Sequence, residues 1–353
     1  MPLPNDAGTL VVVDPRHDPR WAGLVSGPQG SVFTSPPWLR AISATYEEFA
    51  PEAIVVCDDH GAPRSGVASV PVHDALGARR LGLPFSDYAD LVIGAESPRA
   101  PLLAALLADG ARVRLRTLHA DLDGVDPRLQ ATHEAGWHTV AVDDDEDVLW
   151  DRLGGSSRRN IRKARDSGIE LAVHADLDAV RRFYALHVGV RIGKYGLLPQ
   201  PRDFFDAIHA EFAELAAVRV VMARHDGADV AGILVLVWGD VAYYKFNASS
   251  PAALALRPND LLMWHTMLLA NELGCRSLDL GISELSQAGL VRYKRKFATT
   301  EGRVTTWVTE AAPSPPADQL RSTFGELTSL LADPALPSHV APEAGRLLYR
   351  YFA

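Results

Sequence analysis

The feature that most constrains the fold is an alternation of strand-like and helix-like segments, which runs through the 353 residues in two similar series. Antiparallel hairpins in the middle of each series, with helices on either side, predict an α+β fold with mixed or antiparallel central sheets. The acidic run 143–147 and the nearby Gly154 and Gly155 indicate a junction between the two series. Because single cores rarely grow much past ~250 residues, we expect two domains, at residues 1–147 and 148–353.

Apolar spacing predicts the individual elements. In the first half, the predicted helices are 37–49, 101–107 and 127–135. The predicted strands of this half are 53–57, 66–73, a short strand near 81, 91–93, 113–118 and 138–142. In the second half, the predicted helices are 156–167, 178–190 and 202–214. The predicted strands of this half are 169–174, 218–224, 230–238, 241–247, 275–282 and 303–309. A tail that is proline-rich from residue 311 then carries helices at 317–332 and 343–351.

Composition excludes several classes of protein. The two cysteines, Cys57 and Cys275, fall in different halves, which excludes a disulfide scaffold and a cysteine-based metal site. The histidines show no ligand spacing with acids on a shared face, so we expect no bound metal. The N-terminus lacks the pattern of a signal peptide, and no run of ~18 apolar residues occurs. We therefore expect a soluble, cytoplasmic protein without stable membrane insertion.

Charge is divided unevenly along the chain. The net charge is −9, with residues 1–150 carrying 11 basic and 22 acidic residues and no lysine. Residues 151–353 carry 24 basic and 22 acidic residues. The overall charge argues against strong nonspecific nucleic-acid binding, but an anionic partner would be bound mainly by the second half.

The stretch from Arg257 to Phe297 is the most informative part of the sequence. Its pattern predicts a turn, a helix that Asn259 or Asp260 caps and that runs to Leu273, a strand, and then a basic helix. Gly274 follows the first helix, where a left-handed C-terminal cap is expected. The basic helix contains Arg292, Lys294, Arg295 and Lys296, which form either a solvated face or a site.

A second basic stretch lies at residues 156–165. It contains Arg158, Arg159, Arg162, Lys163 and Arg165 without an intervening acid. Such a row on one helix suits contacts with phosphates, and the alternative is ordinary surface charge.

Two further groups of residues are candidates for a cleft. Arg191 and Tyr195 lie four residues apart, which places them on one side if the helix continues that far. Tyr243 and Tyr244 lie on a strand and point to opposite faces, so we expect one to be core and the other to be accessible.

Several motifs, taken in order, resemble the FemAB (FemX-like) branch of the GNAT-fold superfamily, over roughly residues 30–310. They are Phe33–Trp38, Leu83–Tyr88, Arg159–Gly168, Arg191–Phe205, Arg257–Leu262, Leu278–Gly281, and Tyr293-Lys294 with Phe297. The resemblance implies two tandem GNAT-like domains with an acceptor cleft between them. Members with a long coiled-coil arm need ~50 additional heptad residues, so the armless form is predicted here.

The resemblance also implies an enzyme that moves an amino acid from aminoacyl-tRNA to an amine, with aminoacyl-tRNA as co-substrate and no cofactor. The acceptor is a peptidoglycan precursor or a small natural-product intermediate. Its implied catalytic residues are Lys294 and Tyr244. Its implied substrate-binding residues are Arg191, Tyr195, Tyr243, Trp38, Asp87, Tyr88 and Asn259. Its implied tRNA-binding residues are Arg158, Arg159, Arg162, Lys163, Arg295 and Lys296.

These residue types are compatible with aminoacyl transfer. An aminoacyl ester is already activated, so the enzyme must hold an amine against it and stabilise the oxyanion. Asp87, Asp279 and water are candidates for the general base. The alternatives are an acyl-CoA N-acyltransferase and a noncatalytic binding protein on the same fold. Arg-Pro-Asn-Asp at 257–260 replaces the glycine-rich turn that holds the pyrophosphate in CoA-binding members, which disfavours the CoA alternative.

Overall fold

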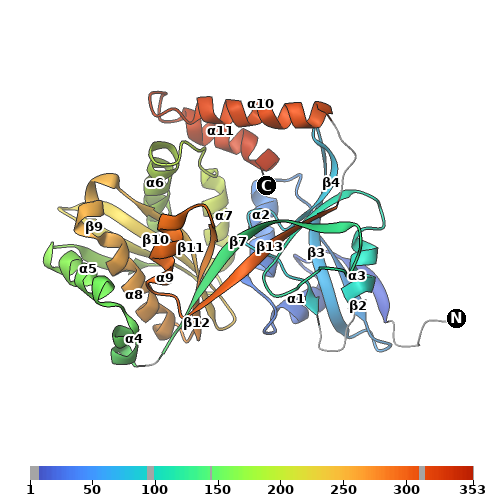
Figure 1. The fold of residues 1–353 in the computed structure, drawn as a ribbon, viewed down its shortest axis with the longest axis horizontal. Helices are drawn as coiled ribbons and strands as arrows, with labels where there is room; N and C mark the ends of the chain where they lie inside the picture. Colours follow the sequence, from blue (N-terminus) through green and yellow to red (C-terminus); the bar gives the residue numbers. More distant parts are fainter. Residues whose placement is uncertain (1–7, 94–98, 144, 310–314, 353) are drawn as a thin grey trace. The chain divides into compact units, whose positions relative to one another are not determined.

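The computed structural model describes residues 8–93, 99–143, 145–309 and 315–352. The chain forms two compact units (Figure 1). Among the described residues, the first unit comprises 8–93, 99–135, 303–309 and 315–320, and the second comprises 136–143, 145–302 and 321–352. The predicted boundary at 147 and 148 lies within the second unit. The N-terminal residues 1–7, Asp144 of the acidic run and the proline-rich stretch 310–314 lie outside the described residues.

The first unit contains a mixed sheet flanked by helices. Its strands are β1 (Thr9–Val13), β2 (Glu52–Cys57), β3 (Pro63–Asp74), β4 (Gly77–Gly82), β5 (Val92–Ile93) and β6 (Arg112–Thr117), with parts of β7 (Leu129–Ala141) and β13 (Thr300–Thr309). Its helices are α1 (Pro19–Val25), the short η1 (Val32–Thr34), α2 (Pro36–Thr45) and α3 (Arg99–Leu106). The strand order is β1-β2-β3-β4-β6-β13, with β5 on β3, and only β4 and β6 pair in parallel among the printed registers of this unit.

The second unit repeats this architecture. Its strands are the end of β7, β8 (Glu170–His174), β9 (Val218–His225), β10 (Ala228–Trp238), β11 (Val241–Ser249) and β12 (Ser277–Glu284), in the order β7-β12-β11-β10-β9-β8. Its helices are α4 (Glu146–Arg152), α5 (Gly155–Asp166), α6 (Leu177–Gly193), α7 (Arg202–Ala213), η2 (Pro251–Leu256), α8 (Pro258–Glu272) and α9 (Ala288–Arg295). The tail forms α10 (Pro315–Leu331), α11 (Val340–Leu348) and η3 (Tyr349–Phe352).

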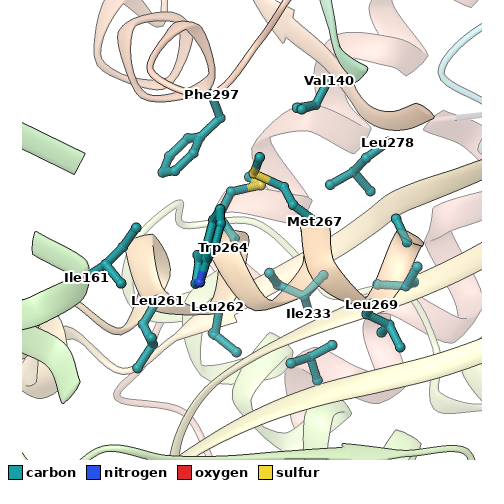
Figure 2. Close-up of a cluster of buried hydrophobic side chains, with 14 of the residues drawn as sticks. Val140, Ile161, Ile233, Leu261, Leu262, Trp264, Met267, Leu269, Leu278 and Phe297 are labelled. Atoms are coloured by element: carbon teal, nitrogen blue, oxygen red, sulfur yellow. The ribbon is translucent and has the colours of Figure 1, made fainter. Parts of the chain in front are cut away.

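Helix α8 is the centre of the main core of the second unit. Figure 2 shows Trp264 and Met267 of α8 among the side chains of Ile161, Leu278 and Phe297. These side chains come from α5, β12 and the residue that follows the C-cap of α9, and each is at most 5% exposed. Burying large apolar side chains is worth about 1.5–3 kcal/mol each. The core therefore holds the basic helices α5 and α9 beside α8.

Two local predictions are wrong. The helix expected at 127–135 is part of strand β7. Alanine, glutamine and glutamate favour a helix there, but pairing within a sheet overrides propensity. Asn259 and Asp260 do not cap α8, because the N-cap is Arg257 and both residues lie in the first turn. Gly274 does adopt the predicted left-handed conformation, with φ of 72°.

The predicted fold class is confirmed: both units contain mixed sheets flanked by helices. In the described ranges, the longest helices have 17 residues, which is too short for a coiled-coil arm. Across those same ranges, no helix combines the length and the hydropathy needed to cross a bilayer. Among the described residues, no group of histidine, cysteine and acidic side chains is arranged to hold a metal ion.

Candidate functional site

A pocket of about 490 Å³ lies at the N-terminal end of α8 in the second unit. It is lined by Asn160, Leu254, Arg257, Pro258, Asn259, Asp260, Gly289, Arg292, Tyr293 and Lys296. These residues come from α5, η2, α8, α9 and their adjoining residues. The pocket thus joins segments that are more than 100 residues apart in the sequence.

The turn that opens the pocket has an unusual backbone. Arg257 has φ of 66°, in the left-handed region that glycine normally occupies. Pro258 then begins α8, where its fixed φ suits the first helical position and its missing N–H costs nothing. Backbone strain of this kind often occurs at functional sites. The first turn of α8 carries a partial positive charge because its N–H groups have no partners within the helix.

An ion pair closes one side of the pocket. The Asp260 carboxylate is 5% exposed and accepts a hydrogen bond from Nζ of Lys296. The same ammonium lies 5.3 Å from the ring centre of Tyr293 and 5.4 Å from that of Phe297. The helix terminus therefore already has an internal anion, whose charge Lys296 balances.

Tyr293 and Asn259 complete the inner wall. The Tyr293 hydroxyl donates to the Asn259 carbonyl oxygen over 2.9 Å. Burial raises the pKa of Tyr293 well above its usual value, and the neighbouring Tyr244 and Asp260 raise it further. The Asn259 side chain donates from Nδ2 to Ser249, whereas its Oδ1 has no hydrogen-bond partner among the described residues. Oδ1 can therefore accept a hydrogen bond from a ligand.

Lys294 lies on the opposite side of α9, where it is 4% exposed. Its Nζ donates to the carbonyl oxygens of Gly281 over 3.1 Å and Ile282 over 2.7 Å. The parallel pairing of β11 with β12 covers only Val241–Tyr243 and Ser277–Asp279. The ammonium therefore binds β12 beyond the part of the strand that pairs with β11. The predicted catalytic role of Lys294 stays a prediction.

The two adjacent tyrosines of β11 have different environments. Tyr243 is 3% exposed, which leaves little of its surface for a ligand. Tyr244 is half-buried and packs against the core around α8. Burial raises the pKa of Tyr244, and the nearby Tyr195 raises it further. Tyr244 therefore stays a neutral hydroxyl donor at physiological pH, and it lies close enough to Tyr195 and Tyr293 for these phenols to disfavour one another's ionisation.

Arg191 is held by the loop that follows α6. Its Nε and Nη2 both lie 3.1 Å from the carbonyl oxygen of Leu198, and Nη2 also donates to the Tyr349 hydroxyl over 3.2 Å. Tyr195 is 46% exposed, and Nζ of Lys194 lies 5.0 Å from its ring centre. Arg191 thus orders its own loop, while Tyr195 remains accessible to a substrate.

The basic helix α5 presents its charges to solvent. Ile161 and Ala164 are buried, whereas Arg159, Arg162 and Lys163 are exposed. Arg158 is half-buried and lies 3.3 Å from Asp151. The guanidinium of Arg162 lies 5.6 Å from the ring centre of Trp150. Asn160, between these charges, reaches the pocket. Arg295 instead forms an exposed ion pair with Glu301 over 2.9 Å and does not line the pocket.

The candidates of the first unit lie in an aromatic cluster. Trp38 has no exposed surface, and its indole N–H donates to Ser86 over 3.0 Å. Tyr88 is 5% exposed and meets Phe33 edge to face at 5.2 Å. Their burial indicates a structural role, while Asp87 between Ser86 and Tyr88 is half-buried.

Of the predicted site residues, only Asn259 and Lys296 line the pocket. Sequence reasoning left Arg292 open as surface charge or part of a site, and it did not predict Asn160 or Arg257 as site residues. The Arg-Pro dipeptide at 257–258 could have indicated the position of Arg257. The residue before a proline is disfavoured in the helical region, so Arg257 is expected in the turn that precedes α8. Nothing in the local sequence places Asn160 in the pocket.

Comparison with known proteins confirms the predicted architecture. Residues 155–295 match a family model described as the acetyltransferase (GNAT) domain. The crystal structure of FemX is 14% identical, with a TM-score of 0.61 over 84% of this chain and 96% of that chain. A tandem GNAT protein from the clavulanic acid biosynthesis pathway is 16% identical, with a TM-score of 0.52 over 87% and 99%.

A third similar structure is the C-terminal domain (DUF2156) of a putative lysylphosphatidylglycerol synthetase from Agrobacterium fabrum. It is 15% identical, with a TM-score of 0.56 over 86% of this chain and 95% of that chain. No curated protein matches the sequence. At these identities the structures show the fold, which consists of tandem GNAT-like domains and resembles FemX. The matched domain and the fold support an acyltransferase.

Proposed function

We propose that this protein is an aminoacyltransferase that moves an amino acid from aminoacyl-tRNA to an amine acceptor and forms an amide bond. The acceptor is a peptidoglycan precursor or a small natural-product intermediate. The observation that carries the proposal is the pocket at the start of α8, which combines Arg257, Arg292 and Lys296 with the buried Asp260.

The pocket is better suited to nucleotide chemistry than to the pyrophosphate of CoA. A pyrophosphate site needs a glycine-rich turn whose amides approach the phosphates closely. Here Arg257 occupies the left-handed position of the turn, and the Asp260 carboxylate already lies in the first turn of the helix. Arg257 and Arg292 can bind phosphates at the rim. The Asp260 carboxylate and Oδ1 of Asn259 can accept hydrogen bonds from hydroxyl or amino groups inside.

Exposed positive charge beside the pocket suits the binding of a polyanion that extends beyond the pocket. Arg159, Arg162 and Lys163 are exposed on α5, and Asn160 of the same helix lines the pocket. Phosphate contacts from such a row give sequence-independent affinity for nucleic acid. We assign α5 to the acceptor stem of the tRNA and the pocket to its terminal nucleotide.

Transfer from an aminoacyl ester does not require a covalent enzyme intermediate. Burial raises the pKa of the Cys275 thiol to about 11, so that it is a poor nucleophile near neutral pH. We assign Lys294 to stabilisation of the oxyanion, because two backbone carbonyls orient its ammonium. Tyr244 is a neutral hydrogen-bond donor to the reacting carbonyl or amine. The Asp279 carboxylate accepts from Trp137 and from the Gly281 N–H, which indicates a structural role rather than that of a base.

Transfer assays with radiolabelled donors test the proposal. The purified protein is incubated with a pool of aminoacyl-tRNAs and candidate amines, and parallel reactions contain RNase or replace the tRNA with acyl-CoA. We expect amide formation that RNase abolishes. Transfer that survives RNase and depends on acyl-CoA would instead establish the CoA-dependent alternative.

The Lys294→Met variant separates an enzyme from a binding protein. Loss of an oxyanion donor should lower kcat by about 100-fold or more. Arg295→Met is the matched control, because Arg295 is adjacent but exposed and paired with Glu301. Unchanged turnover in Lys294→Met would remove Lys294 from the mechanism. Ligand binding without turnover in the wild-type protein would support the noncatalytic alternative.

A further inference from the structure

Strand β6 of the first unit carries a row of arginines on one face. Arg112, Arg114 and Arg116 alternate with Val113, Leu115 and Thr117, and the latter three are buried. Side chains two residues apart on a strand point to the same face, with about 6.6–6.8 Å between them along the strand. The three guanidinium groups therefore share one face of the sheet.

Several other arginines of this unit have carboxylate partners. Arg16 pairs with Asp14 over 2.8 Å, and Arg64 pairs with Asp58 over 2.7 Å. Arg80 pairs with both Glu52 and Asp109. Arg114 and Arg116 have no carboxylate partner among the described residues.

The strands on either side of β6 do not supply a counter-charge. Leu81 of β4 and Val308 of β13 are in register with Arg114, and Thr306 of β13 is in register with Arg116. Desolvation by neighbouring atoms lowers the pKa of Arg114, although the residue is exposed, and the charges of Arg116 and Arg112 lower it further. Like charges on adjacent positions of one sheet face are destabilising. The row thus has an electrostatic cost that no described side chain offsets.

The row is adjacent to the loop that carries Asp87 and Tyr88. Nη1 of Arg116 donates to the carbonyl oxygen of Ser86 over 3.5 Å, and the Ala89 N–H donates to the Arg116 carbonyl over 2.8 Å. The resemblance drawn from the sequence assigns Asp87 and Tyr88 to substrate binding. Arg116 therefore lies beside the loop that carries Asp87, the half-buried residue of this loop that is expected to bind the acceptor, and Arg114 lies two residues away on the same strand.

We propose that Arg114 and Arg116 form an anion subsite that binds a phosphate or carboxylate group of the acceptor amine. The inference rests on the proposed function, and it specifies the acceptor as an anionic amine. Two guanidinium groups on alternate strand positions can bind one anion together or two linked anionic groups separately. Binding the anion offsets the repulsion within the row. The subsite therefore selects anionic acceptors over neutral ones of the same size.

Matched acceptors test this selectivity and distinguish the two anions. Ethanolamine, O-phosphoethanolamine and β-alanine present a primary amine with a hydroxyl, a phosphate and a carboxylate respectively. We expect the wild-type protein to prefer at least one anionic amine by about tenfold or more in kcat/KM, the range for a charge-assisted contact. Arg114→Gln and Arg116→Gln should each remove most of this preference through KM, and Arg114→Lys should restore part of it.

Arg64→Gln is the matched control, because Arg64 is an exposed arginine of the same unit that is paired with Asp58. It removes one charge and should leave the preference unchanged. Equal use of the three amines by the wild-type protein would overturn the subsite. An equal loss of activity in Arg64→Gln and Arg114→Gln would also overturn it.

Calorimetric titration with O-phosphoethanolamine, without any donor, separates this inference from the proposed function. We expect Arg114→Gln to weaken binding about tenfold and Arg64→Gln to leave it unchanged. This result would support the subsite even if no aminoacyl transfer were detected. Binding that is the same in Arg114→Gln and wild-type protein would refute the subsite even if tRNA-dependent transfer were established.

Discussion

Burial keeps several potentially reactive side chains in their neutral form up to a higher pH than usual. The hydroxyls of Tyr244 and Tyr293 have raised pKa values, and so does the Cys275 thiol. Desolvation disfavours the charged form of each group. At neutral pH, the pocket therefore combines the neutral Tyr293 hydroxyl with the ammonium of Lys296. This arrangement suits stabilisation of a developing negative charge better than nucleophilic attack.

Burial also favours the neutral form of His187, a basic side chain. This has a consequence for the dependence of folding stability on pH. His187 is 5% exposed, and burial lowers its pKa to about 4. The unfolded chain binds this proton below about pH 6.5, whereas the folded chain does so only near pH 4. Folding stability should therefore fall as the pH falls through this window. Between about pH 7 and about pH 4.5, His187 should account for a loss of about 2–3 kcal/mol.

Urea unfolding followed by circular dichroism at these two pH values measures the effect. In His187→Gln, the loss of stability on acidification should be smaller by about 2–3 kcal/mol than in the wild-type protein. His60→Gln, at an exposed position, should keep the wild-type dependence. Identical pH dependence in His187→Gln and wild-type protein would contradict the prediction.

At the scale of elements, the loop between α6 and α7 is held from two directions. From α6, Tyr184 donates to the Gln200 carbonyl over 3.1 Å and Arg191 donates to Leu198. From the tail, the Tyr349 hydroxyl accepts a hydrogen bond from Arg191, and Ala341 and Ala344 of α11 pack in one cluster with Leu198. The tail helices thus help to order the loop that contains Tyr195.

Gly345 is the point of closest approach between α11 and this loop. A Cβ at Gly345 would lie 2.2 Å from the Pro199 carbonyl oxygen. Glycine to alanine usually stabilises a helix by about 0.5–1 kcal/mol, but Gly345→Ala should destabilise the protein because the backbone oxygen cannot move aside. Gly325→Ala in α10, where a Cβ meets nothing within 4 Å, should be neutral or stabilising. Thermal unfolding compares the two variants.

Hydrogen exchange reports whether the loop itself is affected. The amide of Leu197 donates to the Arg191 carbonyl over 2.9 Å, so its protection measures loop order. It should exchange faster in Gly345→Ala than in Gly325→Ala. Equal exchange in both variants would show that α11 does not order the loop.

At the scale of the whole molecule, a net charge of −9 repels a polyanion, so tRNA binding must depend on local basic surface. If α5 provides that surface, Arg159→Gln combined with Lys163→Gln should weaken tRNA binding and reduce the salt slope of log K by about 1–2. Filter binding over a range of salt concentrations measures the slope.

The control is Arg224→Gln combined with Arg276→Gln, which removes two exposed arginines that have acidic partners. It should leave the slope unchanged. Equal reductions in the two double variants would indicate nonspecific attraction instead of a defined tRNA surface.

Local pattern was sufficient for much of the fold. The alternation of apolar spacing, the left-handed cap at Gly274 and the two basic helices are visible in the sequence, and the structure contains them. Secondary structure was harder to predict from the sequence where pairing between distant strands determines it. The first residues of β7 favour a helix locally, which is why a helix is predicted at 127–135, and only the neighbouring strands in the sheet make this segment part of a strand.

The candidate site shows the same division. The sequence by itself determined the residue types available for the chemistry, including Lys294, Lys296 and the exposed charges of α5. Only the tertiary structure decided that Asn160 shares a pocket with Arg257 and Lys296, that Lys294 binds the carbonyls of β12, and that Trp38 is fully buried. The reason is physical: periodicity and capping arise between near neighbours in the chain, whereas burial and side-chain partners depend on packing between distant segments.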